Sequence, residues 1–365
     1  MKIIEVANVD FALRHFVLPL MLGLRDRGHE VIGVSADGPL LPEPDGFRVI
    51  ALPMARSLNP WAQARAAWAL WRLFRAERPD LVHGHFPISG FLARIVARAA
   101  GVPKIAYTCH GFLFNQPGPA WRRWLSVVME WLGGRVTDVF MTVSAEEAAD
   151  ARRLHIARDP IAIGNGRDPA RFRPDAATRA MIRAEMGTAE ATCVIIAVSR
   201  LVRHKGYREL VAAMAAVPEA ELWVVGNRLA TDRGEDVEAA MEAAGLGGRL
   251  KRLGYRADVP ALLAAADVFC LPSYFEGLPM GVIEAMLTGL PVVATDIRGC
   301  REQVLPEQTG LLVPPMQVPP LAEALARLAA DPALRARMGA AGRARAMAEY
   351  DEAKVLARTL DLLGA

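Results

Sequence analysis

Two glutamates with seven residues between them are the most chemically informative feature of this chain. Glu276 lies in a loop-like segment with Gly277 and Gly281, and Glu284 follows. The glycines let the backbone approach a ligand, and the pattern predicts a helix that begins near Met280 and holds Glu284 in its first turn. Free N–H groups at a helix N-terminus favour phosphate, whereas carboxylates accept hydrogen bonds from sugar hydroxyls. The segment therefore suits a sugar attached to a phosphate.

A basic loop follows the apolar stretch 192–198 and contains Arg200 and Lys205. If that stretch is a strand, both cations lie at its carboxyl end, where doubly wound sheets bind their ligands. The alternative is a solvated basic turn that ends at Gly206, and we expect Arg203 and His204 to face solvent. The chain contains no Asp-x-Asp motif, so we predict no metal site and no cofactor.

Three histidines lie at the carboxyl ends of two further apolar stretches. His110 follows the stretch 104–108 and precedes a glycine, which places its imidazole at the rim of a sheet. His83 and His85 end the stretch 81–85, and their spacing puts both side chains on one face of a strand. A zinc site needs more ligands, and no third candidate stands out. We therefore predict a structural role for His83 and His85.

Short apolar strands alternate with helical stretches along the whole chain, which predicts an α/β fold with two parallel, Rossmann-like sheets. The segment 164–175 is rich in glycine and proline and is the expected linker. We expect a first domain over residues 1–168, a second over 169–348 and a final helix over 349–365. The ligand site is expected in the cleft between the sheets. The expected strands are 2–6, 30–35, 47–52, 81–85, 104–108, 139–143, 192–198, 221–225, 250–253, 268–271 and 291–294, with helices at 14–27 and 61–75 among others.

The block 267–296, which contains the two glutamates and the sequence Gly-Leu-Pro-Val-Val-Ala, resembles the retaining glycosyltransferases of family 4. That resemblance implies the GT-B fold, a nucleotide-sugar donor and a final helix that packs back on the first domain. It implies that the catalytic residues are His110, Arg200, Lys205 and Glu276. It implies that the donor-binding residues are Gly226, Tyr255, Gly277, Leu278, Pro279, Met280, Gly281 and Glu284.

Within that resemblance, two cations hold the diphosphate, Glu284 binds the ribose, Glu276 binds the donor sugar, and His110 contacts that sugar. The nucleobase is held mostly by backbone groups near Gly226 and Tyr255, and a UDP-sugar is the expected donor.

The loop after the first strand departs from the glycine-rich turn of many family members. It resembles the branch that adds sugars to lipid-linked precursors of surface polysaccharides such as O-antigen and capsule. We expect Asp10, Arg14, His15 and Phe112 on the acceptor side, with Asp10 as a helix N-cap being the alternative for that loop. The same loop lacks the Gly-x-Gly-x-x-Gly of a nicotinamide-dependent dehydrogenase.

The formal net charge of +3 over 365 residues argues against nucleic-acid binding. The four scattered cysteines indicate reduced thiols, and no apolar run has the ~20 residues that span a bilayer. We expect a cytoplasmic protein, peripheral on the inner face of the cell membrane. Tryptophan mixed with arginine in 61–78 and 112–131 suits an anionic membrane surface. For 61–78 we favour a helix that buries Trp68 and Trp71, and for 112–124 we favour the membrane or lipid acceptor.

The sequence therefore predicts a retaining, metal-independent glycosyltransferase that moves a hexose or N-acetylhexosamine to a lipid-diphosphate-linked saccharide. Two alternatives stay open. A nucleotide-sugar epimerase of the same fold would isomerise the donor without an acceptor. A sugar-nucleotide-binding subunit would catalyse nothing, and it would have no need of the full set of site residues.

Overall fold

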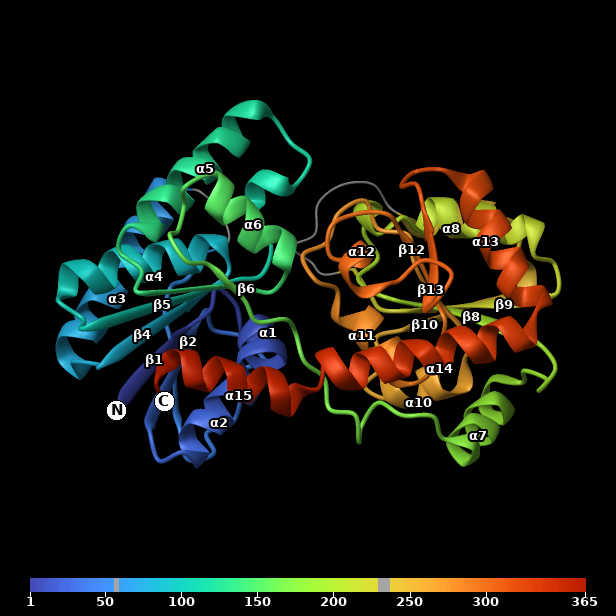
Figure 1. The fold of residues 1–365 in the computed structure, drawn as a ribbon, viewed down its shortest axis with the longest axis horizontal. Coiled ribbons are helices and arrows are strands. Elements are labelled where there is room, and N and C mark those ends of the chain that lie inside the picture. Colours follow the sequence, from blue (N-terminus) through green and yellow to red (C-terminus); the bar gives the residue numbers. More distant parts are fainter. Residues whose placement is uncertain (56–58, 229–236) are drawn as a thin grey trace. The chain divides into compact units, whose positions relative to one another are not determined.

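A computed structural model describes residues 1–55, 59–228 and 237–365. The chain forms two compact units (Figure 1), one of Met1–Gly164 together with Lys354–Ala365 and the other of Asn165–Ala353. Over the described residues each unit holds one parallel sheet, with seven strands in the first and six in the second. The α/β class with two Rossmann-like parallel sheets is confirmed.

The first sheet has the strand order β3-β2-β1-β4-β5-β6-β7. Its strands are β1 (Lys2–Val6), β2 (Glu30–Ser35), β3 (Arg48–Ala51), β4 (Leu81–His85), β5 (Lys104–Cys109), β6 (Val139–Thr142) and β7 (Ile161–Ala162). The helices of this unit are α1 (Asp10–Ala12), α2 (Leu18–Asp26), α3 (Pro60–Glu77), α4 (Pro87–Ala100), α5 (Ala120–Gly134), α6 (Ala145–Arg153) and α15 (Glu352–Leu363).

The second sheet has the order β10-β9-β8-β11-β12-β13. Its strands are β8 (Cys193–Val198), β9 (Ala220–Val225), β10 (Leu250–Gly254), β11 (Val268–Leu271), β12 (Val292–Thr295) and β13 (Gly310–Val313). The helices are α7 (Ala176–Met186), α8 (Tyr207–Ala213), α9 (Val237–Ala243), α10 (Val259–Ala265), α11 (Met280–Leu287), α12 (Cys300–Gln303), α13 (Val318–Ala330) and α14 (Pro332–Glu349).

Both faces of the first sheet are covered, because successive residues of its strands enter different cores. Ile3 belongs to the core that includes α2, whereas Ile4 belongs to the core that includes α3 and α4. Strands buried on both faces are apolar almost throughout, as parallel sheets require. Helix α15 adds Leu360 and Leu363 to the core that holds Ile3, and the Lys104 ammonium donates to the Leu363 carbonyl at 2.7 Å. The chain's last helix therefore completes the first unit.

The structure differs from the sequence-based expectation in short or irregular elements. Strands β7 and β13 were not expected. Strand β7 has only two residues, too few to show periodicity, and gains its strand geometry from its neighbour β6. Strand β13 pairs with β12. The helix expected at 14–27 consists of a π-helical segment, Leu13–Val17, and α2, and it is preceded directly by α1.

Candidate functional site

In the second unit, the loops that follow β8 and β11 meet at a partly buried ion pair. Lys205 Nζ lies 2.5 Å from Glu276 Oε1, and the Ser273 hydroxyl donates to the same oxygen at 2.7 Å. Strands β8 and β11 are neighbours in the sheet, so their carboxyl ends lie side by side. The structure thus brings together two of the predicted site residues, a cation and a carboxylate, each about one-eighth exposed. Arg200 is half-buried in the loop that leads to Lys205.

Gly206 makes this meeting of loops possible. Its φ of +73° is left-handed, and a Cβ at this position would lie 2.0 Å from the Pro272 carbonyl oxygen. Any other residue would therefore push the two loops apart. His204, expected to face solvent, instead stacks on Phe275 with ring centroids 4.6 Å apart, whereas Arg203 is exposed as expected.

Helix α11 begins at Met280, which confirms the predicted start. Because Glu284 is its fifth residue, that carboxylate opens the second turn, and the expectation of a first-turn position is wrong. A helical side chain leans toward the N-terminus of its helix, so Glu284 still extends toward the start of α11. Proline at the N-cap position, Pro279, cannot supply a capping side chain.

Sequence reasoning missed the partner of Glu284. Arg167, in the expected linker, donates through Nε to Glu284 Oε1 at 2.6 Å. Burial raises the pKa of Glu284 above its ordinary value, and the charge of Arg167 opposes that rise. Asn165 donates from its side chain to the Leu278 carbonyl at 2.7 Å, so the linker motif is more than a turn. The sequence held one signal for this contact, because Arg167 is a charged residue between a glycine and an aspartate in the expected linker.

The turns after β9 and β10 form a third part of this edge of the sheet. Gly226, with φ of +130°, donates its N–H to the Gly254 carbonyl at 2.7 Å. A Cβ on Gly226 would lie 2.1 Å from the Ser199 carbonyl oxygen. Tyr255 follows with 63% of its side chain exposed, which leaves its ring available to a ligand. Gly277 and Met280 are partly exposed, while Leu278 and Pro279 are buried.

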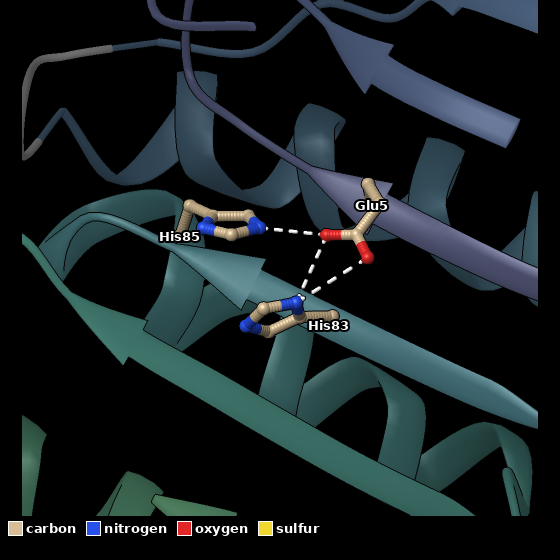
Figure 2. Close-up of side chains that lie close together, drawn as sticks. All are labelled: Glu5, His83 and His85. Atoms are coloured by element: carbon tan, nitrogen blue, oxygen red, sulfur yellow. Dashed lines mark hydrogen bonds and ion pairs between the residues drawn. The ribbon is translucent and has the colours of Figure 1, made fainter. Parts of the chain in front are cut away.

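In the first unit, two histidines share one buried carboxylate (Figure 2). Glu5 Oε2 lies 3.0 Å from His83 Nδ1 and 2.6 Å from His85 Nε2, and both imidazoles point toward it. Glu5 and His83 are register partners on β1 and β4. The expectation that no third group accompanies the histidines is wrong, because Glu5 is such a group. The sequence held a signal for this third group, because Glu5 is a charged residue among the apolar residues of the strand Lys2–Val6.

The same cluster is the group of possible metal ligands within the described residues, with ligand atoms no more than 4.8 Å apart. A tetrahedral zinc ion with ligands at about 2.0–2.1 Å would hold them about 3.3 Å from each other. Oxygen and nitrogen at 2.6 Å are closer than that and suit a shared proton. The arrangement therefore fits hydrogen bonding better than a metal.

The cluster extends to two residues at the end of β5. The Thr108 hydroxyl lies 2.8 Å from His83 Nε2, and His110 Nε2 lies 3.2 Å from His85 Nδ1. The half-buried His110 ring stacks on Phe86 at 4.4 Å between centroids. The predicted site histidine is thus one end of a hydrogen-bonded series.

The other predicted site residues of this unit differ from one another in their exposure and contacts. Val9, and not Asp10, holds the N-cap position of α1, because the Asp10 carboxylate accepts instead from the backbone N–H groups of Phe11 and Leu40. Arg14 is exposed, and His15 packs on the Phe11 ring at 4.4 Å.

Phe112, expected on the acceptor side, is only 1% exposed. Its ring stacks on Phe114 within a core cluster, which leaves it no surface for an acceptor.

Helix α5 presents aromatic side chains to solvent. Trp121 and Trp124 are 63% and 68% exposed, next to the exposed Arg122 and Arg123. The buried face of α5 holds Glu130, whose carboxylate pairs with the buried Arg94 at 2.8 Å and accepts from the Tyr107 hydroxyl at 2.9 Å. Its polar pairing faces inward and its tryptophans face outward, which is the reverse of an ordinary surface helix.

Helix α3 also exposes Trp61, Trp68 and Trp71, so the expectation that this helix buries Trp68 and Trp71 is wrong. Trp68 instead stacks on Trp71 at 5.2 Å between centroids. Among the described residues, the helices are all too short or too polar to cross a bilayer.

Two family models match this chain. The model described as "Glycosyl transferase 4-like domain" matches residues 12–166, and the one described as "Glycosyl transferases group 1" matches residues 178–345. The first match lies in the unit that holds the histidine cluster, and the second spans the Lys205–Glu276 and Glu284 sites.

Two similar proteins are named as glycosyltransferases. The chain is 30% identical over 307 residues to an Escherichia coli UDP-Gal:alpha-D-GlcNAc-diphosphoundecaprenol alpha-1,3-galactosyltransferase, a match that covers 80% of this chain and 77% of that protein. It is 25% identical over 380 residues to a Campylobacter jejuni N,N'-diacetylbacillosaminyl-diphospho-undecaprenol alpha-1,3-N-acetylgalactosaminyltransferase, covering 99% and 98% of the two chains.

A solved structure shares the fold. Anabaena Alr3699/HepE, in complex with UDP and glucose, matches with a TM-score of 0.83 at 22% identity and covers 100% of both chains. The GT-B fold that the sequence resemblance implied is confirmed by this likeness and by the two parallel sheets.

Proposed function

This chain belongs to the glycosyltransferase family of the group 1 and 4-like models, and from that premise we propose that it transfers a sugar from UDP to a lipid-diphosphate-linked saccharide. The transfer retains the anomeric configuration, as in family 4, and serves surface polysaccharide assembly at the inner face of the cell membrane. Two relatives named for diphosphoundecaprenol-linked saccharides support this acceptor class. The UDP-bound neighbour structure supports the donor only through its shared fold.

The observation that carries the proposal is the cluster at the carboxyl ends of β8 and β11. There Lys205 pairs with Glu276, which lies in the same segment as the N-terminus of α11. A departing diphosphate needs fixed positive charge, which Lys205, Arg200 and the α11 N-terminus supply. Glu276, held by Ser273, accepts hydrogen bonds from hydroxyls of the transferred sugar.

The remaining donor contacts are assigned by position. Glu284 binds the ribose hydroxyls while Arg167 balances its charge. The nucleobase lies against the exposed Tyr255 and backbone groups near Gly226, and the backbone of 277–281 lines the diphosphate. In the first unit, His110 orients the transferred sugar. Arg14 and His15 serve the acceptor, whereas Asp10 holds the loop through Leu40.

The exposed face of α5 is the proposed contact with an anionic membrane. Trp121 and Trp124 suit the headgroup region, and Arg122 and Arg123 suit anionic lipid. A hollow beside the helix mixes apolar and basic side chains, which suits a lipid diphosphate. Its lining is Leu113, Gln116, Pro117, Gly118, Arg122, Arg123, Leu125, Ser126 and Met129.

Thermal stabilisation by UDP-, GDP- and ADP-sugars in EDTA tests the donor assignment. A ligand at a hundred times its Kd adds about 2.7 kcal/mol of stability, and we expect this with UDP-sugars. Glu284→Ala should abolish most of the shift, while Glu323→Ala, an exposed glutamate on α13, should retain it. Equal shifts in both variants would remove Glu284 from the donor site, and no shift with any nucleotide sugar would reject the proposed donor class.

A further inference from the structure

A buried hydrogen-bonded series connects three adjacent strands to His110. It runs from Glu5 on β1 through His85 on β4 to His110, the residue after β5, with steps of 2.6 and 3.2 Å. Glu5 is fully buried and His85 is 3% exposed. The side chains are 25 and 80 residues apart in sequence, so only the sheet register brings them together.

The donors and acceptors in this series can be assigned from the carboxylate outward. An ionised carboxylate only accepts hydrogen bonds, so His85 donates through Nε2–H and its partner His83 through Nδ1–H. Burial would raise the pKa of Glu5, yet its interactions with His83 and His85, hydrogen bonds among them, outweigh burial and lower that pKa to about 2. Glu5 is therefore ionised at neutral pH.

The next question is which ring nitrogen of His85 carries its proton. Burial, together with the charge of His83, lowers the pKa of His85 to about 4 despite the opposing charge of Glu5, so His85 is neutral. A neutral imidazole has one donor and one acceptor nitrogen. Since Nε2–H of His85 is used on Glu5, its Nδ1 accepts, and the group that faces Nδ1 is Nε2 of His110. His110 must donate from that nitrogen.

We propose that Glu5 and His85 are positioning residues that hold His110 in the tautomer with its proton on Nε2 and a lone pair on Nδ1. His110 then accepts a hydrogen bond from a sugar hydroxyl through Nδ1 and donates none from that atom. A buried carboxylate behind a histidine sets its ring orientation and tautomer in the same way in other sites. Burial and the nearby His85 and His83 lower the pKa of His110 well below its ordinary value, in keeping with a neutral ring.

Packing holds the ring plane as well as the proton. Phe86 stacks on His110 at an interplanar angle of 24°, and Phe16 meets it edge-on at 5.9 Å. Phe86 adopts φ 63° and ψ 154°, a backbone conformation that is nearly restricted to glycine. Its neighbours hold it there, since the Phe86 carbonyl accepts from Gly90 at 2.8 Å. The strain is tolerated at the residue that covers the His110 ring.

The test is a direct observation of the His110 tautomer in the full chain without substrate. Long-range ¹H–¹⁵N spectra of protein labelled at histidine distinguish a protonated ring nitrogen from one with a lone pair. We expect the proton on Nε2 of His110 in the wild type. A proton on Nδ1, or one equivalent of zinc bound to the purified protein at Glu5, would overturn the proposal.

Variants then test the cause. In Glu5→Gln the new amide can donate to His85, and in His85→Phe the acceptor for His110 is lost, so both should change the His110 tautomer. Thr108→Val is the matched control, because it removes only the hydroxyl beside His83 and should leave the tautomer as it is. An unchanged tautomer in both test variants would overturn the proposal, and if one variant fails to fold, the other and the wild-type measurement decide it.

The consequence for turnover rests on the proposed function. In Glu5→Gln we expect kcat for sugar transfer to fall roughly 10- to 100-fold while KM for the donor changes little, since the lost interaction orients a reacting group. Because the tautomer is read without substrate, failure of the transfer assay leaves that measurement intact. A changed tautomer with unchanged kcat would refute the link to turnover.

Discussion

Acidification should destabilise the first unit through His85. The folded protein lowers the pKa of His85 from 6.5 to about 4, so below pH 6.5 the unfolded chain binds a proton that the folded chain refuses. The contribution of His85 to the free energy of unfolding is therefore fully present above pH 6.5. It is lost as the pH falls toward 4, by about 1.4 kcal/mol per pH unit and roughly 3 kcal/mol in all.

Glu5 extends the effect to lower pH. Its folded pKa of about 2 lies below the ordinary 4.5, so its contribution is present above pH 4.5 and is lost between 4.5 and 2. Between pH 6.5 and 5 the part of the loss that comes from His85 should be about 2 kcal/mol, or roughly a 30-fold change in local opening. His110, whose pKa is also lowered, adds a further loss in the same window.

Hydrogen exchange of the full chain, corrected for intrinsic rates, measures this opening. Amides of β1, β4 and β5 should lose protection between pH 6.5 and 5 more than those of β8 and β11, which serve as an internal reference. His85→Gln still offers a donor to Glu5. It should remove the part of the pH dependence that comes from the uptake of about one proton on opening. His155→Gln, at an exposed histidine, should leave it unchanged. Equal pH dependence in the wild type and His85→Gln would refute the reasoning.

Three other perturbations follow from named contacts. Arg167→Ala leaves Glu284 partly buried without its cation and should cost about 3 kcal/mol in urea unfolding, with weaker stabilisation by nucleotide sugars; an unchanged urea midpoint would show that the pair is not stabilising. Glu130→Ala leaves a buried arginine uncompensated and should cost about 3–5 kcal/mol, whereas a loss below about 1 kcal/mol would mean that water reaches the site. Trp121→Ser with Trp124→Ser should weaken binding to anionic vesicles about tenfold or more while stabilisation by donor is kept, and equal vesicle binding would exclude this face of α5.

Local sequence was sufficient for most of the secondary structure and for part of the site. Strand β11 and the start of α11 at Met280 were predictable, because a continuous apolar run and helix-start signals involve residues close in the chain. The family resemblance of the segment around Glu276 could be recognised for the same reason. The short strand β7 could not, since a strand of two residues exists only through its neighbour β6.

The sequence by itself determined the class of the fold, the family and most of the candidate residues, since these depend on patterns within short stretches. Only the tertiary structure decided which charges meet. Lys205 pairs with Glu276, Arg167 pairs with Glu284, and His110 is hydrogen-bonded to Glu5 through His85. These partners are separated by 25 to 117 residues, so their pairing is set by strand order, register and burial, which no local pattern encodes.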